Sequence, residues 1–425
     1  MKVFCFLFCS ISSICFAGQL VVHEWGTFTS LQDETGNSVV GINVDDEPVP
    51  PFVHRVRDLL PIYSLDDRPA YWFQGAPGCH PQATMRLETP VIYFYPSEVA
   101  LNQPLDVTVK FKGGWITEFF PSGDLVAPEF PADLSRDTVG AVAWRGLSLG
   151  NEGPSRQTED HVWVTPRRVR SASVRSNDKE VERFLFYRGI GQIDAPLRVT
   201  QSEDGSTLTV GAVESMRINH LWILEVRTDR SVAFRDVGSF DSANGIISVP
   251  RRFSPTDFRR ENLQLLKTSM HKALVSDGLF EDEAAAMLDT WELSYFKSPG
   301  LRVFFLVPRL WTDRRLPLEI SISADITRVM VGRIELITPE QRMVLQRIGS
   351  AKINFRTMPS ELLVANRFEE LSGQLRDQIP ELYQAYLNLG RFRVAIIFDE
   401  LRRRPSAGLK QFVTTTVCGR NINID

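Results

Sequence analysis

The chain has 425 residues, a formal charge of −4 and a 43% share of hydrophobic residues, which is enough to bury a core and indicates an ordinary globular protein. Its basic clusters, "PRRVR" and "RRR", stand among acidic residues, so the charge pattern predicts no nucleic-acid partner. The length predicts two or three domains. Function must therefore be sought in local motifs.

Residues 1–17 have the pattern of a secretory signal peptide, with one positive charge at Lys2, an apolar run and the small residue Ala17 at its end. The run is shorter than the ~20 apolar residues of a spanning helix and is interrupted by serines. We expect cleavage before Gly18 or Gln19. No later stretch is apolar enough to span a membrane, so the mature chain is expected in the periplasm or outside the cell.

Two of the five cysteines, Cys79 and Cys418, lie beyond this leader. We predict that they form a disulfide, which would tie an N-terminal loop to the C-terminal tail. Two separate thiols are the alternative, because nothing in the sequence shows that the sulfurs meet. A chain of this length can build its core without a disulfide framework.

Residues 18–250 are predicted to form a β-rich, sandwich-like domain. The segments "QLVVHEWGTFTSL" and "SVVGINV" flank the turn-prone "QDETGN" and predict a hairpin. Further short runs rich in β-branched and aromatic residues predict strands. The clearest are "TPVIYFYP", "LDVTVKF", "WITEFF", "RFLFYRG", "STLTVGAV", "INHLWILEV" and "SVAFRDV".

Residues 251–338 are predicted to mix helices with strands, and residues 339–425 to form a helical tail, so the fold class is α+β. Ser254 can cap a first helix that ends at Gly278, and "EDEAAAMLDTWELSYF" predicts a second. Strand-like runs return in "LRVFFLVP", "LPLEISI" and "TRVMVGRIELI". The tail opens with the capping pattern "TPEQ" and is expected to make a docking surface.

The pair His23 and Glu24 in "HEWGT" is the feature of the sequence that most suggests a metal or catalytic site. It is no zinc-protease motif, because Thr27 stands where H-E-x-x-H needs its second histidine. In a regular strand the two side chains point to opposite faces. His23 is then either a core residue packed against Trp25 or a metal ligand, and Glu24 becomes a catalytic base only if a bulge at Gly26 turns it round.

The metal hypothesis rests on the loops downstream, which carry imidazole and carboxylate groups of the kind that bind zinc or another divalent cation. The predicted ligands are His23, His54 and His80 with one of Asp45, Asp46 and Glu47, and Glu24 is the predicted base. The acidic run is otherwise a solvated turn. Another pattern, "GLSLG", fits a nucleophile elbow at Ser148, but Gly153 and Pro154 prevent the helix that the elbow must open.

Several segments, among them "VVHEWGTFTS", "DDEPVPPFVH", "RLETPVIYFYP", "WITEFFP" and "FLFYRGIG", occur together in this chain. In this combination the chain resembles a group of uncharacterised secreted bacterial proteins that share the "HEWGTFT" opening, over most of its mature length. The resemblance implies secretion. It carries no reaction, ligand or catalytic residue onto these positions.

Two functions remain from different classes. The first is a non-catalytic binding or envelope protein, in which the β-rich domain presents loops to a ligand or glycan and the tail docks a partner, possible partners being a protein or a glycan. The alternative is a metal-dependent hydrolase built from the N-terminal histidine and carboxylate loops. Convergence of His23, His54 and His80 on one cavity would favour the hydrolase, and their separation the binding protein.

Overall fold

The computed structural model describes most of the chain between the leader and the C-terminal segment. The described residues are 20–44, 48–56, 72–73, 76–77, 80–126, 134–351 and 381–413. The leader, the acidic run at 45–47 and both Cys79 and Cys418 lie outside them. The cleavage site and the disulfide therefore stay predictions.

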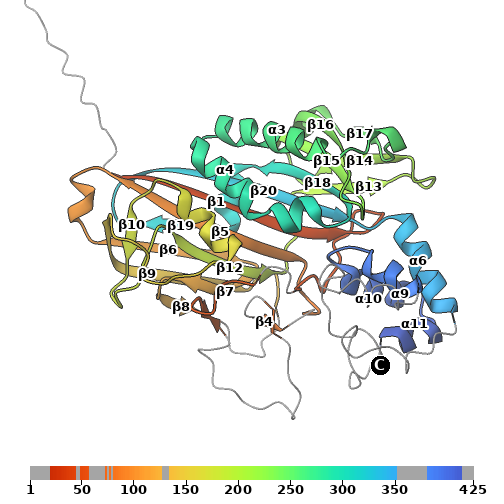
Figure 1. Cartoon of the computed structure of the whole chain (residues 1–425), viewed down its shortest axis with the longest axis horizontal. Helices are drawn as coiled ribbons and strands as arrows, with labels where there is room; N and C mark the ends of the chain where they lie inside the picture. Colours follow the sequence, from red (N-terminus) through yellow and green to blue (C-terminus); the bar gives the residue numbers. More distant parts are fainter. Residues whose placement is uncertain are drawn as a thin grey trace, which may run out of the picture.

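One large mixed sheet forms the centre of the molecule (Figure 1). Strand β1 (Leu20–Gln32) lies between β5 (Met85–Pro96), which is antiparallel to it, and β20 (Ala324–Leu336), which is parallel. Along the main path the strand order is β11-β10-β9-β7-β12-β5-β1-β20-β18-β15-β16. The sheet therefore joins strands from both sides of residue 250.

The predicted strand-rich character of the N-terminal two thirds is confirmed, and the described strands do not close into a barrel. The other strands of the large sheet are β2 (His54–Arg55), β6 (Leu105–Lys112), β7 (Gly114–Phe120), β8 (Asp124–Val126), β9 (Val139–Gly150), β10 (Ser173–Arg175), β11 (Val181–Glu182), β12 (Leu185–Gly191), β15 (Arg217–Val226), β16 (Val232–Asp241), β18 (Gly300–Val307) and β19 (Leu318–Ile320). Smaller sheets contain β13 (Leu197–Gln201), β14 (Thr207–Ala212) and β17 (Ile247–Pro250), and β3 (Trp72–Phe73) with β4 (Ala76–Pro77).

The predicted hairpin is wrong. Ser38 meets Gln32 only in an isolated bridge, and the following residues form no strand. Instead, the buried side chains of Val39 and Ile42 join the core of the C-terminal helices. Both hydrogen-bonding edges of β1 are occupied by β5 and β20, which leaves no edge for a neighbouring hairpin strand.

A bulge does lie opposite Gly26, but it belongs to β5. Between the pairs formed by Trp25 and Thr27, the single residue Gly26 faces two residues of β5, Thr89 and Pro90. Glycine is required there because a Cβ atom would come within 2.9 Å of Pro90 Cα. Strand β1 therefore keeps its regular alternation, and the bulge does not turn Glu24 round.

Helices cover one face of the central strands (Figure 1). The cap at Ser254 opens only a 3-10 turn, η4 (Pro255–Asp257), and helix α3 begins later (Asn262–Ser276). Helix α4 (Glu281–Thr290) follows, and the predicted second helix ends in a π-helical turn, η5 (Glu292–Lys297). Their apolar side chains form one core with Trp25, while the opposite face of β1 contributes Leu20 and Val22 to a second core.

Four helices near the C-terminus gather around a third core (Figure 1). They are α6 (Pro339–Ser350), α9 (Glu381–Leu387), α10 (Arg393–Arg403) and α11 (Ala407–Phe412), and Thr338 caps α6 as predicted. The short helices are α2 (His161–Val164), α5 (Arg309–Arg315), η1 (Ala100–Asn102), η2 (Pro166–Arg168) and η3 (Ser242–Asn244). Of the helices in the described ranges, none has the length and apolarity needed to cross a membrane.

Candidate functional site: a polar cleft beside the central strand

His23 is buried on the face of β1 that α4 covers, with 4% of the residue exposed. Its Nδ1 lies 2.7 Å from Glu283 Oε2, and because a carboxylate only accepts, Nδ1 carries the proton. The same carboxylate accepts hydrogen bonds from the Tyr95 hydroxyl and the Phe280 amide, at 2.8 and 2.7 Å. The rings of Phe280 and Tyr95 contact the imidazole. His23 thus fastens the start of α4 to the sheet.

Glu24 points to the opposite face, as the strand alternation predicts. It is fully buried, and it accepts hydrogen bonds from the Tyr187 hydroxyl and from Nε of Arg328. Burial raises the pKa of Tyr187, and the charge of Glu24 raises it further, so the phenol stays protonated and donates. Both oxygens of Glu24 are held by protein donors. This geometry gives Glu24 a structural role and does not support the predicted role as a base.

The other two predicted histidines lie elsewhere. His54 Nε2 is 2.8 Å from Glu180 Oε2, and β2 pairs with β7, which is three strands from β1 and hence roughly 14 Å away at ~4.8 Å per strand. His80 packs edge-on against Trp115 at the start of β7. The structure therefore does not bring His23, His54 and His80 together.

The acidic members of the predicted site, Asp45, Asp46 and Glu47, lie outside the described residues. Within the part of the chain that the structure describes, no group of three His, Cys, Asp or Glu side chains is arranged to hold a metal ion. Ser148 lies inside β9, and no helix directly follows "GLSLG". This agrees with the prediction that the segment is not a nucleophile elbow.

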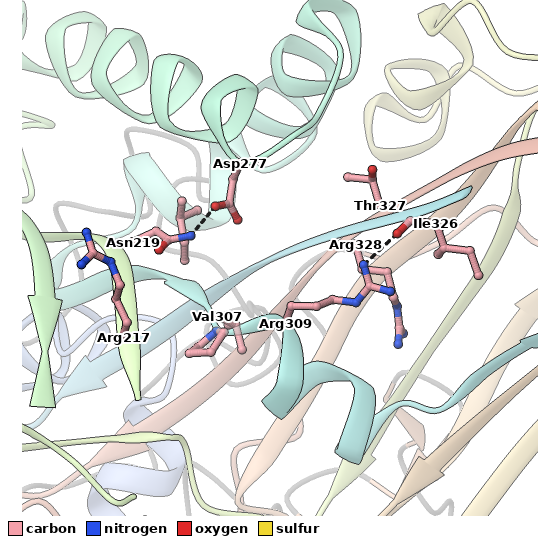
Figure 2. Close-up of a pocket in the computed structure, with 10 residues that line it drawn as sticks. Arg217, Asn219, Asp277, Val307, Arg309, Ile326, Thr327 and Arg328 are labelled. Atoms are coloured by element: carbon pink, nitrogen blue, oxygen red, sulfur yellow. Dashed lines mark hydrogen bonds between the residues drawn. The ribbon is translucent and has the colours of Figure 1, made fainter. Parts of the chain in front are cut away.

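A cleft of about 270 Å³ opens near His23, between the end of α3 and strands β15, β18 and β20 (Figure 2). It is close to the central motif because Thr327, which pairs with His23 in the parallel register, forms part of its wall. The lining is mostly polar. The polar side chains are those of Arg217, Asn219, Asp277, Arg309, Thr327 and Arg328.

Each element places its residue by a local feature. Arg217 and Asn219 are exposed residues at the start of β15, where the pairing with β16 shifts register after Ile218, and both line the cleft. Asp277 caps the C-terminal end of α3, where Gly278 ends the helix with a φ of +118°. Arg309 opens α5 directly after Pro308.

Two of the guanidinium groups are held in place by Asp313. Nε of Arg309 donates to both carboxylate oxygens of Asp313, at 2.9 and 2.8 Å, and its Nη1 donates to the carbonyl of Ile326 at 2.8 Å. Nη1 of Arg328 also donates to Asp313, at 2.8 Å, but its buried Nη2 has no partner among the described residues. Arg328 is buried and also paired with Glu24, so of these two groups only the half-exposed Arg309 presents a preorganised guanidinium to the cleft.

Arg217 and Asp277 are not neutralised in this way. Arg217 is exposed and forms no ion pair or hydrogen bond with side chains in the described ranges. Asp277 accepts a 2.5 Å hydrogen bond from Asn219 but pairs with no arginine. Burial raises the pKa of Asp277, and the hydrogen bond from Asn219 offsets part of that rise. The cleft can therefore bind charged groups.

No motif in the sequence points to the cleft. Arg217, Asp277 and Arg309 come from three separate segments, and none belongs to a recognisable motif. One local signal points to Asp277. It stands directly before the glycine that ends a helix, where the helix dipole disfavours a negative charge. Such a residue is a candidate for a role other than stabilising the fold.

Comparison with known proteins gives no family. No family model matches the chain, and neither does any curated protein. Among solved structures, the zebrafish (Danio rerio) Fcho1 Mu homology domain with bound Eps15 peptide aligns with 76% of this chain and 96% of its own, at 9% identity and a TM-score of 0.27. The yeast delta-COP-I mu-homology domain with a Dsl1 peptide aligns with the same shares of the two chains, at 7% identity and a TM-score of 0.26. Likenesses this weak support no conclusion.

Proposed function

We propose that this protein is a non-catalytic binding protein that takes a small anionic ligand in the cleft between α3, β15, β18 and β20. The observation that supports this best is the unpaired Arg217 at a cleft that Arg309, held in place by Asp313, also lines. Guanidinium groups bind carboxylates and phosphates through paired hydrogen bonds. Of the side chains that line the cleft, none is a nucleophile beside a general base, which favours binding over catalysis.

The volume limits the size of the ligand. Pockets for drug-sized molecules usually have ~300–1,000 Å³, and this cleft has about 270 Å³. A small organic acid or a phosphate therefore suits it better than a long chain.

Isothermal titration calorimetry with succinate and with inorganic phosphate, at low and high salt, tests the proposal. We expect binding that weakens as salt rises, because screening reduces charge attraction, and at least tenfold weaker binding by Arg217→Ala. The control is Arg156→Ala, which removes an exposed arginine outside the cleft. The proposal is rejected if neither anion binds at millimolar concentration. It is also rejected if Arg217→Ala binds as tightly as the wild type and the Arg156→Ala control do.

One observation favours a second candidate, the metal-dependent hydrolase. The Glu283 carboxylate holds Nδ1 of His23, as outer carboxylates hold metal-binding histidines, and no described residue bonds Nε2. Elemental analysis of protein purified without chelators and refilled with zinc or manganese tests this. The hydrolase predicts stoichiometric metal that is lost in His23→Ala and kept in His220→Ala, whose imidazole is held by Asp236. Metal-free wild type excludes it.

A further inference from the structure

We infer that the ligand of the cleft is a zwitterion, a small molecule with an anionic group and a protonated amine, such as a free amino acid. This inference rests on the proposed function and specifies the class of ligand. It follows from a feature of the cleft beyond its positive charge. The cleft also contains an unpaired carboxylate, and the structure keeps it apart from the unpaired guanidinium.

Asp277 supplies the negative end. It is half-buried, its only hydrogen bond in the described part of the chain comes from Asn219, and no cationic side chain pairs with it. It also caps the C-terminal end of the 15-residue helix α3, where the helix dipole is negative and a carboxylate is disfavoured. A half-buried carboxylate in such a place is stabilised by a bound cation.

Arg217 supplies the positive end. It comes from β15 and reaches the cleft beside Asn219, which Figure 2 shows between Arg217 and Asp277. Because the amide of Asn219 donates to the Asp277 carboxylate, that carboxylate is held toward the amide and the two opposite charges stay unpaired. A ligand with both charges can meet both groups at once.

The other charges of the cleft do not neutralise Asp277. Arg309 is bound to Asp313, and Arg328 is bound to Glu24 and to Asp313. The carbonyl oxygen of the Asn219 side chain has no partner among the described residues, so it can accept a hydrogen bond from an ammonium group that Asp277 attracts. The cleft thus offers acceptors for an amine and donors for an acid.

Calorimetry with three matched kinds of probe tests the inference on the full chain. The twenty L-amino acids are titrated one by one, and the tightest binder is compared with its deaminated acid and its decarboxylated amine. We expect the amino acid to bind at least tenfold more tightly than either analogue. If the deaminated acid binds as tightly through Arg217, the zwitterion inference is wrong while the proposed anion-binding function stands. If no amino acid binds, the zwitterion inference fails, and the titrations with succinate and inorganic phosphate decide the proposed function separately.

Variants separate the two ends of the ligand. Asp277→Asn should weaken binding of the amino acid tenfold or more and leave the affinity for the deaminated acid within twofold. Arg217→Ala should weaken both. The control Asp137→Asn removes an exposed carboxylate outside the cleft, and circular dichroism confirms that each variant folds. Equal losses for amino acid and deaminated acid in Asp277→Asn would overturn the assignment of Asp277 to the amine.

Discussion

The titratable side chains of β1, His23 and Glu24, are paired within the protein, whereas Arg217 and Asp277 in the cleft are not paired with any opposite charge in the described part of the chain. On β1, His23 is bound to Glu283, Glu24 to Arg328 and Tyr187, and each pair is buried. In the cleft, Arg217 and Asp277 keep unpaired charges at the surface. His23 and Glu24, which most suggest a catalytic or metal site in the sequence, therefore hold the fold together, and the binding that we propose lies where charges stay unpaired.

Three polar residues of β1 are hydrogen-bonded to elements that lie far away in the sequence. His23 holds the start of α4, Glu24 holds β20, and the Thr29 hydroxyl donates at 3.0 Å to Glu88 on β5. Glu88 in turn accepts from the Tyr295 hydroxyl in the π-helical turn. The strand lies at the centre of the sheet, so buried polar groups there need partners on neighbouring elements. The "HEWGTFT" segment thus has a structural explanation.

The largest effect is expected at Glu24. Arg328 is compensated by the buried Glu24 and by the partly exposed Asp313; Glu24→Gln removes the buried carboxylate, and breaking such a pair costs about 3–5 kcal/mol of unfolding free energy. Urea denaturation measures the change. The matched control is Glu319→Gln, which breaks the exposed pair with Lys110 and should cost no more than ~1 kcal/mol. Equal losses in the two variants would contradict the structural role of Glu24.

His23→Ala should come next. It leaves the buried Glu283 carboxylate without its imidazole partner but with the donors from Tyr95 and Phe280, so we expect a loss of about 1–3 kcal/mol. His271→Ala, which removes a partly exposed imidazole on α3, is the control and should cost less than half as much. A variant as stable as the wild type in urea would show that His23 does not fasten α4.

Glu34 follows β1 and contacts the C-terminal helices, and its carboxyl group predicts that the stability of the protein depends on pH. Burial alone would raise its pKa, but hydrogen bonds from Arg342 and Arg403 outweigh burial and lower the pKa below 4.5. A lowered pKa means that the stabilisation is present above pH ~4.5 and is lost as pH falls through the folded value. Glu34→Gln should lose about 1 kcal/mol at pH 7 and less at pH 3. If urea denaturation showed the same loss of unfolding free energy at pH 7 and at pH 3, this prediction would be refuted.

Local patterns were sufficient to predict many strands and helices but not their partners. The segments of β5, β6, β7 and β12 were identified because β-branched and aromatic residues alternate between turn residues. The segment of β1 also has a strand pattern, yet its neighbour β20 lies some 300 residues away in the sequence. The predicted hairpin is wrong because segments adjacent in the sequence need not be adjacent in the sheet.

The same limit applies to the site. The sequence shows that His23 and Glu24 face opposite ways, but their partners Glu283 and Arg328 are 260 and 304 residues distant. Proximity in sequence suggested His54 and His80 as partners, and the sheet separates them. No periodicity predicts which long-range pairs form, because that depends on the whole topology.

The smallest effect is expected at Asp277, and its sign is opposite to that at Glu34. Burial raises the pKa of Asp277, so the folded state binds its proton more readily than the unfolded state, and stability falls as pH rises through the folded value. Asp277→Asn removes this loss and the unfavourable charge at the end of α3. We expect the variant to be more stable than the wild type at pH 7, by less than ~1 kcal/mol because the side chain is partly exposed, and equal to it near pH 3. Thermal unfolding of both proteins at pH 3, 5 and 7 measures the difference. A variant that is less stable at pH 7 would place Asp277 among the residues that hold the fold, and the contrast between the cleft and β1 would then be lost.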